Sequence, residues 1–419
     1  MFATVKQIFN PKNRDIQKKI LFTFAALFIF KLGTAITVPG VNIDKSGLGF
    51  LEIVNAMSGG AFEQASIFAL GVMPYITASI AIQLLSMDII PYLSELNKQG
   101  GVGRNKLNQI TRIVGIVLAF VQGYMYSFAY IKNGSPMDYM LYALVLTAGT
   151  ALLLWIGDQV TQKGVGNGIS MIIMAGIITT LPSMFSSLWT ELITNGNGFM
   201  GILTFVLFVV VFLGIIIGVV FEECAERRIP IQYANKSTSM LGKQNYIPFK
   251  LNSAGVMPVI FASAIISIPQ IIASLAKNAD IALFITKYLS YETLTGFSIY
   301  VLLIIVFAYI YTFMQLKPSE LSDNLNKNGG YIPGVRPGKE TEQYIKKVLK
   351  RITIVGACFL ALLASLPILF SKFSTLQTSV TLSGTGLLIV VGVALETYKQ
   401  LESQLVSRTY TKGRKGRRR

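Results

Sequence analysis

The chain has 419 residues, of which 52% are hydrophobic and 14% are charged, and its mean hydropathy is +0.57. Soluble proteins carry charge on about 25% of their residues, so this composition indicates a protein whose main solvent is lipid. The net charge is +17, histidine is absent, and the two cysteines, Cys224 and Cys358, are far apart. This argues against a disulfide framework and against a metal site or histidine-based catalysis, and we expect no cofactor.

Ten apolar segments are long enough to cross a membrane as helices. Their apolar residues run continuously, without the period of two that marks barrel strands. In chain order the segments are residues 20–38, 66–86, 110–130, 139–157, 168–189, 199–221, 254–274, 298–316, 352–371 and 380–396. The sequence therefore predicts an all-α polytopic membrane protein with ten transmembrane helices.

The basic residues predict the direction of these helices. With a cytoplasmic N-terminus, 31 of the 37 Lys and Arg residues fall in cytoplasmic segments and five fall outside. This distribution follows the positive-inside rule, so both termini are predicted to be cytoplasmic. The resulting organisation is a cytoplasmic N-terminus 1–19, a first half 20–189, an external hinge 190–198, a second half 199–396 and a basic cytoplasmic tail 397–419.

A ten-residue phrase occurs once in each half. GVMPYITASI covers residues 71–80 and GVMPVIFASA covers residues 255–264, with seven identical positions. Each copy lies in the second span of its half. Because each half has five spans, an odd number, the two halves must enter the membrane from opposite sides. The repeat is therefore interpreted as the trace of an inverted pseudo-symmetric pair of halves.

The repeated phrase is expected to interrupt two helices. Pro74 and Pro258 lack an N–H group and would kink a helix, while Gly71 and Gly255 allow another backbone to approach closely. Two interpretations remain open. The phrase forms either an ordinary packing kink or a break beside a pathway whose two helices can part.

The spans hold few charges that could carry an ion or a solute. No Asp or Glu lies in the interior of a predicted span, since Asp158 and Glu396 stand at span ends, and Lys31 is the one charge that looks buried. Lys31 either snorkels to the interface or makes a structural hydrogen bond. Transporters usually place ionisable groups in the membrane, so this pattern favours a gate of apolar side chains. The glycine-rich KGVGNGIS, residues 163–170, is interpreted as a turn that begins a helix.

Two cytoplasmic segments are unusually long for connections between helices. They cover residues 222–253 and 317–351, and both are basic, as is the tail that ends in KGRKGRRR. Attraction to anionic lipid explains the tail best. For the two segments, a basic surface that faces an anionic partner such as ribosomal RNA is the competing hypothesis, and charge alone does not separate a ribosome from a protein partner.

The outside segment before the second span has a different character. Phe50 to Met57 could form an amphipathic helix too short to span, and it ends at Gly59-Gly60. Such a re-entrant segment must lie within protein or over a cavity.

These residues together resemble the SecY/Sec61-alpha family of protein-conducting channels. The resemblance covers nearly the whole chain. It rests on the following runs: VPG, SGGAFEQASIFALGVMPYITASIAIQLL, WIGDQVTQKGVGNGISMII, ERRIPIQYA, AGVMPVIFASAII, YIPGVRPG and GTGLLIVVGVALE.

The resemblance implies a bacterial plasma-membrane channel whose two halves clamp around an hourglass pore. Unfolded polypeptides would cross it, and hydrophobic helices would leave sideways into lipid, between helices two and three of one half and seven and eight of the other. The family's aliphatic pore ring matches Val72, Ile76, Ile169, Ile173, Ile260 and Ile389, where Val72 replaces the more usual isoleucine. The repeated phrase would lie at the lateral gate, and the plug of the family matches a segment around 46–62, with Phe50, Leu51, Ile53, Val54 and Met57.

The resemblance also implies partners. SecE and SecG would accompany the chain, signal-bearing polypeptides and anionic lipids would contact it, and SecA or the ribosome would supply energy. The matching contact residues are Arg227, Arg228, Lys236, Lys243, Lys250 and Arg336. The first segment is shorter at its tip, residues 237–244, than in familiar members, which leaves its contacts open. The alternatives are an accessory paralogue for specialised substrates and a secondary transporter built on inverted repeats.

Overall fold

The computed structural model describes most of the chain and shows a mostly helical protein. The described residues are 13–39, 55, 58–87, 89–131, 134–194, 198–233, 245–275, 279–289, 293–374 and 378–416. The helices are α2 (Arg14–Thr34), α4 (Met73–Leu85), α5 (Pro91–Lys98), α6 (Gly101–Tyr130), α7 (Pro136–Lys163), α8 (Gly168–Trp189), α9 (Gly198–Cys224), α10 (Met257–Leu275), α11 (Ala279–Leu289), α12 (Leu294–Gln315), α13 (Pro318–Lys327), α14 (Lys339–Ser374) and α15 (Thr378–Gly416).

Each of the ten predicted spans overlaps one of these helices. Among the described residues, six helical segments are long and apolar enough to cross a membrane: Gly101–Phe128, Pro136–Lys163, Gly168–Ile193, Gly198–Cys224, Leu294–Lys327 and Lys339–Leu366. Two shorter apolar helices, Met73–Leu85 and Met257–Ile266, contain the repeated phrase.

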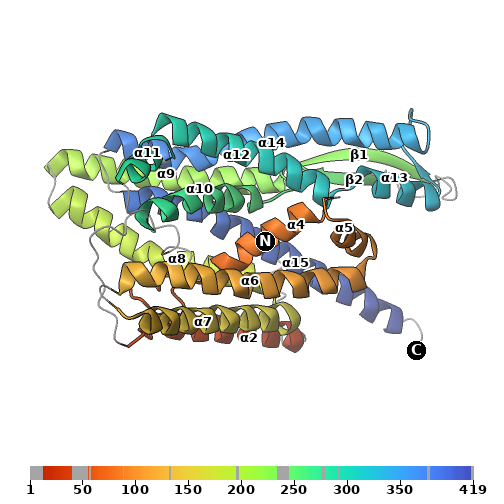
Figure 1. Ribbon diagram of the computed structural model, residues 1–419. Coiled ribbons are helices and arrows are strands. Elements are labelled where there is room, and N and C mark those ends of the chain that lie inside the picture. The colour runs from red at the N-terminus through yellow and green to blue at the C-terminus, as the bar shows by residue number, and fades with distance from the viewer. Residues whose placement is uncertain are drawn as a thin grey trace.

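The helices form two groups that meet along their length (Figure 1). Helices α2, α6 and α7 lie on one side and α12 and α14 on the other. Helix α4 contacts α10 and α8 contacts α15, so these pairs join the two groups. One buried apolar cluster draws residues from both groups, including Ile76, Ile173, Ile260 and Ile389. The hydrophobic core therefore runs across the junction.

The repeated phrase starts two helices instead of kinking them. Gly71 and Gly255 have φ angles of +56° and +62°, which glycine adopts without strain. The helices then begin at Met73 and Met257, so each proline lies in a first turn, where its missing N–H breaks no helical hydrogen bond. A kink within a continuous helix, one of the two interpretations left open, is therefore not what the structure shows.

The two copies repeat the same local hydrogen bonds. Val72 O accepts from Ile76 N at 3.1 Å, and Val256 O accepts from Ile260 N at 3.3 Å. The carbonyl oxygens of both glycines are also bonded by side chains. Gly71 O accepts from the hydroxyl of Thr150 at 3.3 Å, and Gly255 O accepts from the amide of Asn252 at 3.0 Å. The equivalent glycine carbonyl thus accepts a side-chain hydrogen bond in both copies, from a different type of residue in each.

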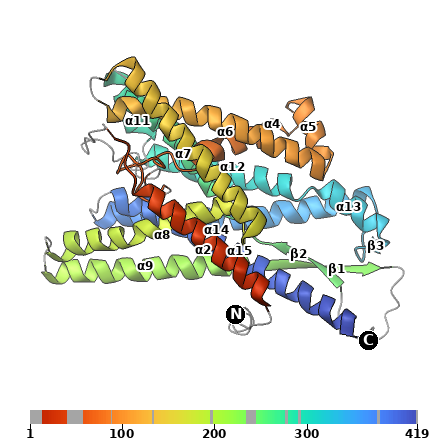
Figure 2. The same cartoon turned by 90° about the horizontal axis from the view of Figure 1, so that it is seen from below.

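The first long cytoplasmic segment contains a β-hairpin, which corrects the all-α expectation. Strand β1 (Glu226–Tyr233) pairs antiparallel with β2 (Asn245–Lys250) and with β3 (Gly330–Tyr331), in the order β2-β1-β3. Ile229 and Ile231 are buried while their neighbours in β1 are exposed, the alternation of a half-buried strand. Their apolar face packs on α13 and α14. Figure 2 shows the sheet at the same end as α13 and the end of α15.

The predicted tail and the predicted hinge both contain helical residues that continue a preceding helix. Helix α15 extends to Gly416, so most of the predicted tail 397–419 is helical. Within this extension Lys399 Nζ donates to Glu223 O at 2.9 Å and ties α15 to the end of α9. In the predicted hinge 190–198, Thr190–Thr194 form a π-helical turn after α8.

Substituting either phrase glycine with alanine should destabilise the protein. A Cβ at a positive φ costs roughly 1–2 kcal/mol, so Gly71→Ala and Gly255→Ala should each lower the midpoint of thermal unfolding of the detergent-purified protein. Gly214→Ala is the control, because Gly214 lies in α9 with open space around the added methyl group. Equal midpoints for all three variants would contradict the assigned backbone conformation.

Candidate functional site

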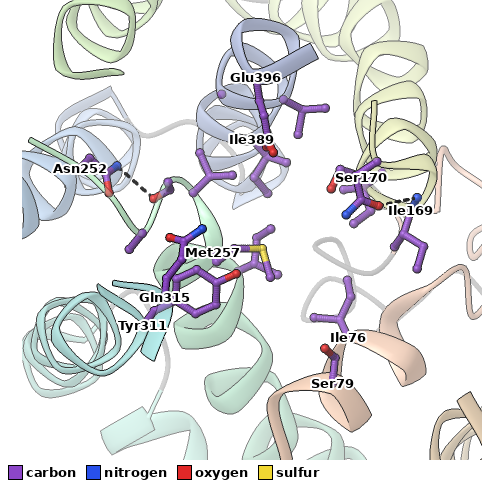
Figure 3. Close-up of a pocket in the computed structure, with 18 of the residues that line it drawn as sticks. Ile76, Ser79, Ile169, Ser170, Asn252, Met257, Tyr311, Gln315, Ile389 and Glu396 are labelled. Atoms are coloured by element: carbon purple, nitrogen blue, oxygen red, sulfur yellow. Dashed lines mark hydrogen bonds between the residues drawn. The ribbon is translucent and has the colours of Figure 1, made fainter. Parts of the chain in front are cut away.

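A cavity of about 350 Å³ lies where the two groups of helices meet. Five of the six predicted ring residues line it: Ile76, Ile169, Ile173, Ile260 and Ile389. Figure 3 shows side chains from several helices turned toward one common space, including those of Ile76, Ile169 and Ile389. Residues far apart in the sequence are therefore brought together as the pore assignment requires.

Local features of α8 and α15 position three of the five isoleucines, Ile169, Ile173 and Ile389. Ile169 and Ile173 lie one turn apart at the start of α8, where the side chain of Asn167 caps the helix by accepting from Ile169 N at 3.1 Å. The cap and the first residues of α8 lie within the glycine-rich KGVGNGIS, which confirms that this run is a turn that begins a helix. On α15, Gly392 allows close approach to the second phrase, since a Cβ there would lie 2.6 Å from Val256 Cγ1.

The isoleucines make a compact apolar floor. Ile76, Ile173 and Ile260 are 5%, 3% and 4% exposed, and Ile389 is 6% exposed. Burying an isoleucine side chain stabilises a structure by about 1.5–3 kcal/mol. Val72 is the exception among the predicted set. It is buried at the N-cap of α4 and is absent from the cavity lining.

Neutral polar side chains line the cavity beyond this floor, and the sequence analysis missed them. They include Ser79 and Gln83 on α4, Ser170 on α8, and Tyr311 and Gln315 on α12. The available signal was the i, i+4 spacing of Ser79 with Gln83 and of Tyr311 with Gln315, which places each pair on one helix face. These residues were missed because only ionisable side chains were considered as polar groups of the pathway.

The cavity wall contains an ion pair between Lys250 and Glu223. Lys250 Nζ lies 3.8 Å from a carboxylate oxygen of Glu223, whose side chain is 8% exposed. Lys250 was predicted to contact a cytoplasmic partner, and the structure places it in the cavity wall. Glu396 also lines the cavity, two turns beyond Ile389 on α15.

The other predicted contact residues lie on the outer surface or outside the described residues. Arg227 and Arg228 are exposed on β1, and the Arg228 guanidinium lies 4.8 Å from the ring centre of Tyr246. Arg336 is 87% exposed in the turn before α14. Lys236 and Lys243 fall outside the described residues.

The predicted plug residues Phe50, Leu51, Ile53, Val54 and Met57 also fall outside the described residues. The turn that follows them is described. Lys31 Nζ donates to Gly59 O at 3.3 Å, and Gly59 has a φ of +74°. A Cβ on Gly59 would lie 3.0 Å from the Thr179 hydroxyl oxygen and 3.2 Å from Gly176 Cα. Lys31 therefore makes the structural hydrogen bond that was one of its two alternatives.

Comparison with known proteins identifies the family. The family model described as SecY matches residues 66–398 of the chain. The chain belongs to the SecY family. The protein translocase subunit SecY of Staphylococcus carnosus is 47% identical over 100% of both chains, and that of Bacillus subtilis is 46% identical over 98% of this chain and 99% of its own.

Solved structures share the fold of this SecY-family chain at lower identity. The structure described as "The structure of a protein conducting channel" has a TM-score of 0.69 and 19% identity, covering 94% of this chain and 93% of its own. The canine Sec61 of a ribosome-channel complex has a TM-score of 0.65 and 18% identity, with the same coverage of 94% and 93%. At this identity the likeness supports the fold alone.

Serine at two floor positions should open the resting SecY-family channel to ions. Each substitution removes about 2 kcal/mol of the stabilisation that apolar burial gives the closed state. This corresponds to a factor of roughly 30 in the equilibrium between the dry, closed channel and the water-filled channel. We expect Ile76→Ser with Ile260→Ser to raise resting conductance in planar bilayers. The control is Ile178→Ser with Ile299→Ser, at exposed positions of α8 and α12. An unchanged conductance in the first variant would remove the seal assignment.

Proposed function

We propose that this chain forms the protein-conducting channel of a bacterial Sec translocase. Unfolded secretory polypeptides pass through the cavity and between the isoleucines, and transmembrane segments leave sideways into lipid. As a SecY-family chain it is a multi-pass protein of the bacterial plasma membrane. The observation that carries the proposal is the apolar floor of the polar cavity, made by five isoleucines from four helices.

An aliphatic constriction suits a passenger of changing shape. Isoleucine side chains present no charge or hydrogen-bonding group, so a narrow ring of them excludes water and ions when empty. The same side chains adapt around a passing chain because their contacts are non-directional. A charged or tightly bonded constriction would instead select one kind of side chain, which a general export channel cannot do.

The lateral gate is assigned to the junction of α4 and α6 with α10 and α12. Helices α4 and α10 contact each other there. A small crevice of the same junction is lined by Ile80 and Leu84 on one side and Phe261 and Phe307 on the other. Apolar walls that face each other without ion pairs can part toward lipid at low electrostatic cost. This arrangement supports sideways release of hydrophobic segments.

The membrane organisation in this proposal has ten spans in two inverted halves with both termini cytoplasmic. The matching helix starts at Gly71 and Gly255 support the inverted repeat. The sheet, α5 and α13 lie at one end of the molecule, with the end of α15 (Figure 1). This end would face the cytoplasm, while residues 190–198 would form the hinge between the halves on the outer side.

Partners follow from the exposed basic end. Two solved structures with a similar fold are ribosome complexes. One is canine Sec61 in a ribosome-channel complex, and the other is the yeast Ssh1 complex bound to the 80S ribosome. Arg227, Arg228 and Arg336 would contact the ribosome or SecA, which supplies the energy. SecE and SecG would complete the membrane complex, and the basic end of α15 would meet anionic lipid.

Two other functions are weaker. An accessory channel for specialised substrates would use the same site, and only its passengers would differ. A secondary transporter would need ionisable groups at the membrane centre, whereas the cavity floor is aliphatic. Uptake of small solutes by this chain in place of polypeptide export would favour the transporter.

A photo-crosslinking side chain at position 76 should capture a precursor during export. The passenger must pass the cavity floor, so a stalled precursor should crosslink at position 76 and much less at position 178, which is exposed on α8. Inverted vesicles with the chain, SecE and SecA provide the assay. Equal capture at both positions would contradict passage through the floor.

Joining the two phrase helices should block export. If α4 and α10 part for passage, a disulfide formed in Ile76→Cys with Ile260→Cys should stop precursor export and a reductant should restore it. Each single variant is the control for damage by the thiols alone. Undiminished export with a complete crosslink would refute the gate.

Reversing the charge of Arg336 should impair SecA-driven export. Arg336 is almost fully exposed and its guanidinium lies 4.0 Å from Glu340, so its loss removes little folding stability. We expect Arg336→Glu to lower the export rate several-fold in vesicles, with Arg336→Lys nearer to normal. Lys339→Glu, a charge reversal three residues away, is the matched control. Normal export in Arg336→Glu would remove this contact from the proposal.

A further inference from the structure

The cavity above the isoleucine floor carries hydrogen-bonding groups that the protein itself leaves unused. The Gln83 amide donates to Ser79 Oγ at 2.9 Å, but its oxygen is buried without a hydrogen-bond partner. Among the residues that the structure describes, no hydrogen bond reaches Ser170 Oγ, the Tyr311 hydroxyl or the Gln315 carboxamide. Figure 3 shows Ser170, Tyr311 and Gln315 around the common space.

These groups form a layer beside the floor. On α4, Ser79 and Gln83 lie one and two turns beyond Ile76, toward the end of the molecule that carries the sheet (Figure 1). Ser170 directly follows Ile169 on α8. Helix α12 supplies Tyr311 and Gln315 from the other group. We call Ser79, Gln83, Ser170, Tyr311 and Gln315 the polar collar.

The chemistry of the polar collar matches a peptide backbone. Amide and hydroxyl side chains each offer both a donor and an acceptor, as does every peptide unit. A chain that enters the aliphatic floor loses the water around its N–H and C=O groups, which is costly without replacement partners. A collar of neutral groups can replace that water without regard to the passenger's side chains.

Charge neutrality is the second feature of the collar. A carboxylate offers acceptors alone and an ammonium offers donors alone, and either would retain passengers of opposite charge. The nearby acid Glu223 is paired with Lys250 at 3.8 Å. Glu396 stands two turns beyond the floor on α15 and adds a carboxylate to the cavity wall. The five collar side chains are themselves uncharged, and the Glu396 carboxylate lies as many turns beyond Ile389 as Gln83 lies beyond Ile76.

We propose that the polar collar is a binding site for the main chain of an extended polypeptide, which exchanges its hydration for collar hydrogen bonds just before the floor. The inference rests on the proposed function and adds the chemistry by which the passenger is held. It assigns the collar a role in the rate of passage, and the isoleucines keep the role of the seal.

Removing collar hydrogen bonds should slow export without opening the seal. We expect Tyr311→Phe with Ser170→Ala to lower the export rate of a precursor in SecA-driven vesicles by about fivefold per hydrogen bond lost. Resting ion conductance should stay at the wild-type level. Tyr309→Phe is the matched control, because this exposed hydroxyl of the same helix bonds Lys350 O outside the cavity.

Charged collar variants test the reason for neutrality. In Gln315→Lys, a precursor with a block of lysines should move several-fold slower than one with a block of glutamates, and Gln315→Glu should reverse that order. The wild-type chain should show a smaller difference between the two precursors.

Three results would overturn the collar. They are wild-type export rates in Tyr311→Phe with Ser170→Ala, equal slowing of both precursors in Gln315→Lys, and raised resting conductance in the first variant. Failure of the wild-type chain itself to export either precursor would instead overturn the proposed function, so the two failures are distinguishable.

Discussion

The structure depends on one constraint, which is that a backbone group in the membrane interior must find a partner within the protein. The repeated phrase meets this constraint at two places where a helix begins partway through an apolar segment. The carbonyl oxygens of Gly71 and Gly255 accept their side-chain hydrogen bonds from Thr150 and Asn252. Those two hydrogen bonds allow α4 and α10 to start where they do, and so set the height of Ile76 and Ile260.

The constriction and the collar divide one task between two kinds of side chain. Isoleucine side chains exclude water because they have no hydrogen-bonding groups. For the same reason, a peptide backbone that passes between them loses its hydrogen bonds to water without replacement. Neutral amides and hydroxyls on the neighbouring turns offset this cost without binding any passenger tightly. Placing both on the same helices, as Ile76, Ser79 and Gln83 are on α4, keeps them in register when the helices move.

The family motifs pointed to five isoleucines that the structure brings together. They are spread over 314 positions, from 76 to 389, and lie on four helices, yet they line one cavity. The sequence left a kink and a helix break both open, because it does not show whether a proline lies within a helix or in its first turn. The positive φ of Gly71, which decides between the two, depends on tertiary contacts. The hairpin was missed because the alternation of Ile229 and Ile231 is short and its apolar partner α14 lies over a hundred residues later.

The surroundings of the two glycines differ in a way that an inverted repeat explains. A Cβ on Gly71 would lie 3.4 Å from Ser58 Cβ, in the described part of the predicted plug segment. A Cβ on Gly255 would lie 3.9 Å from Glu223 Oε1, in the wall of the cavity. One copy therefore begins its helix from the side of the plug turn and the other from the side of the sheet. Each isoleucine follows its glycine by five residues, so in the proposed inverted arrangement two helices that enter from opposite sides would bring Ile76 and Ile260 to the same level. The proposed seal would then form where the two copies meet, and it would weaken as soon as they separate.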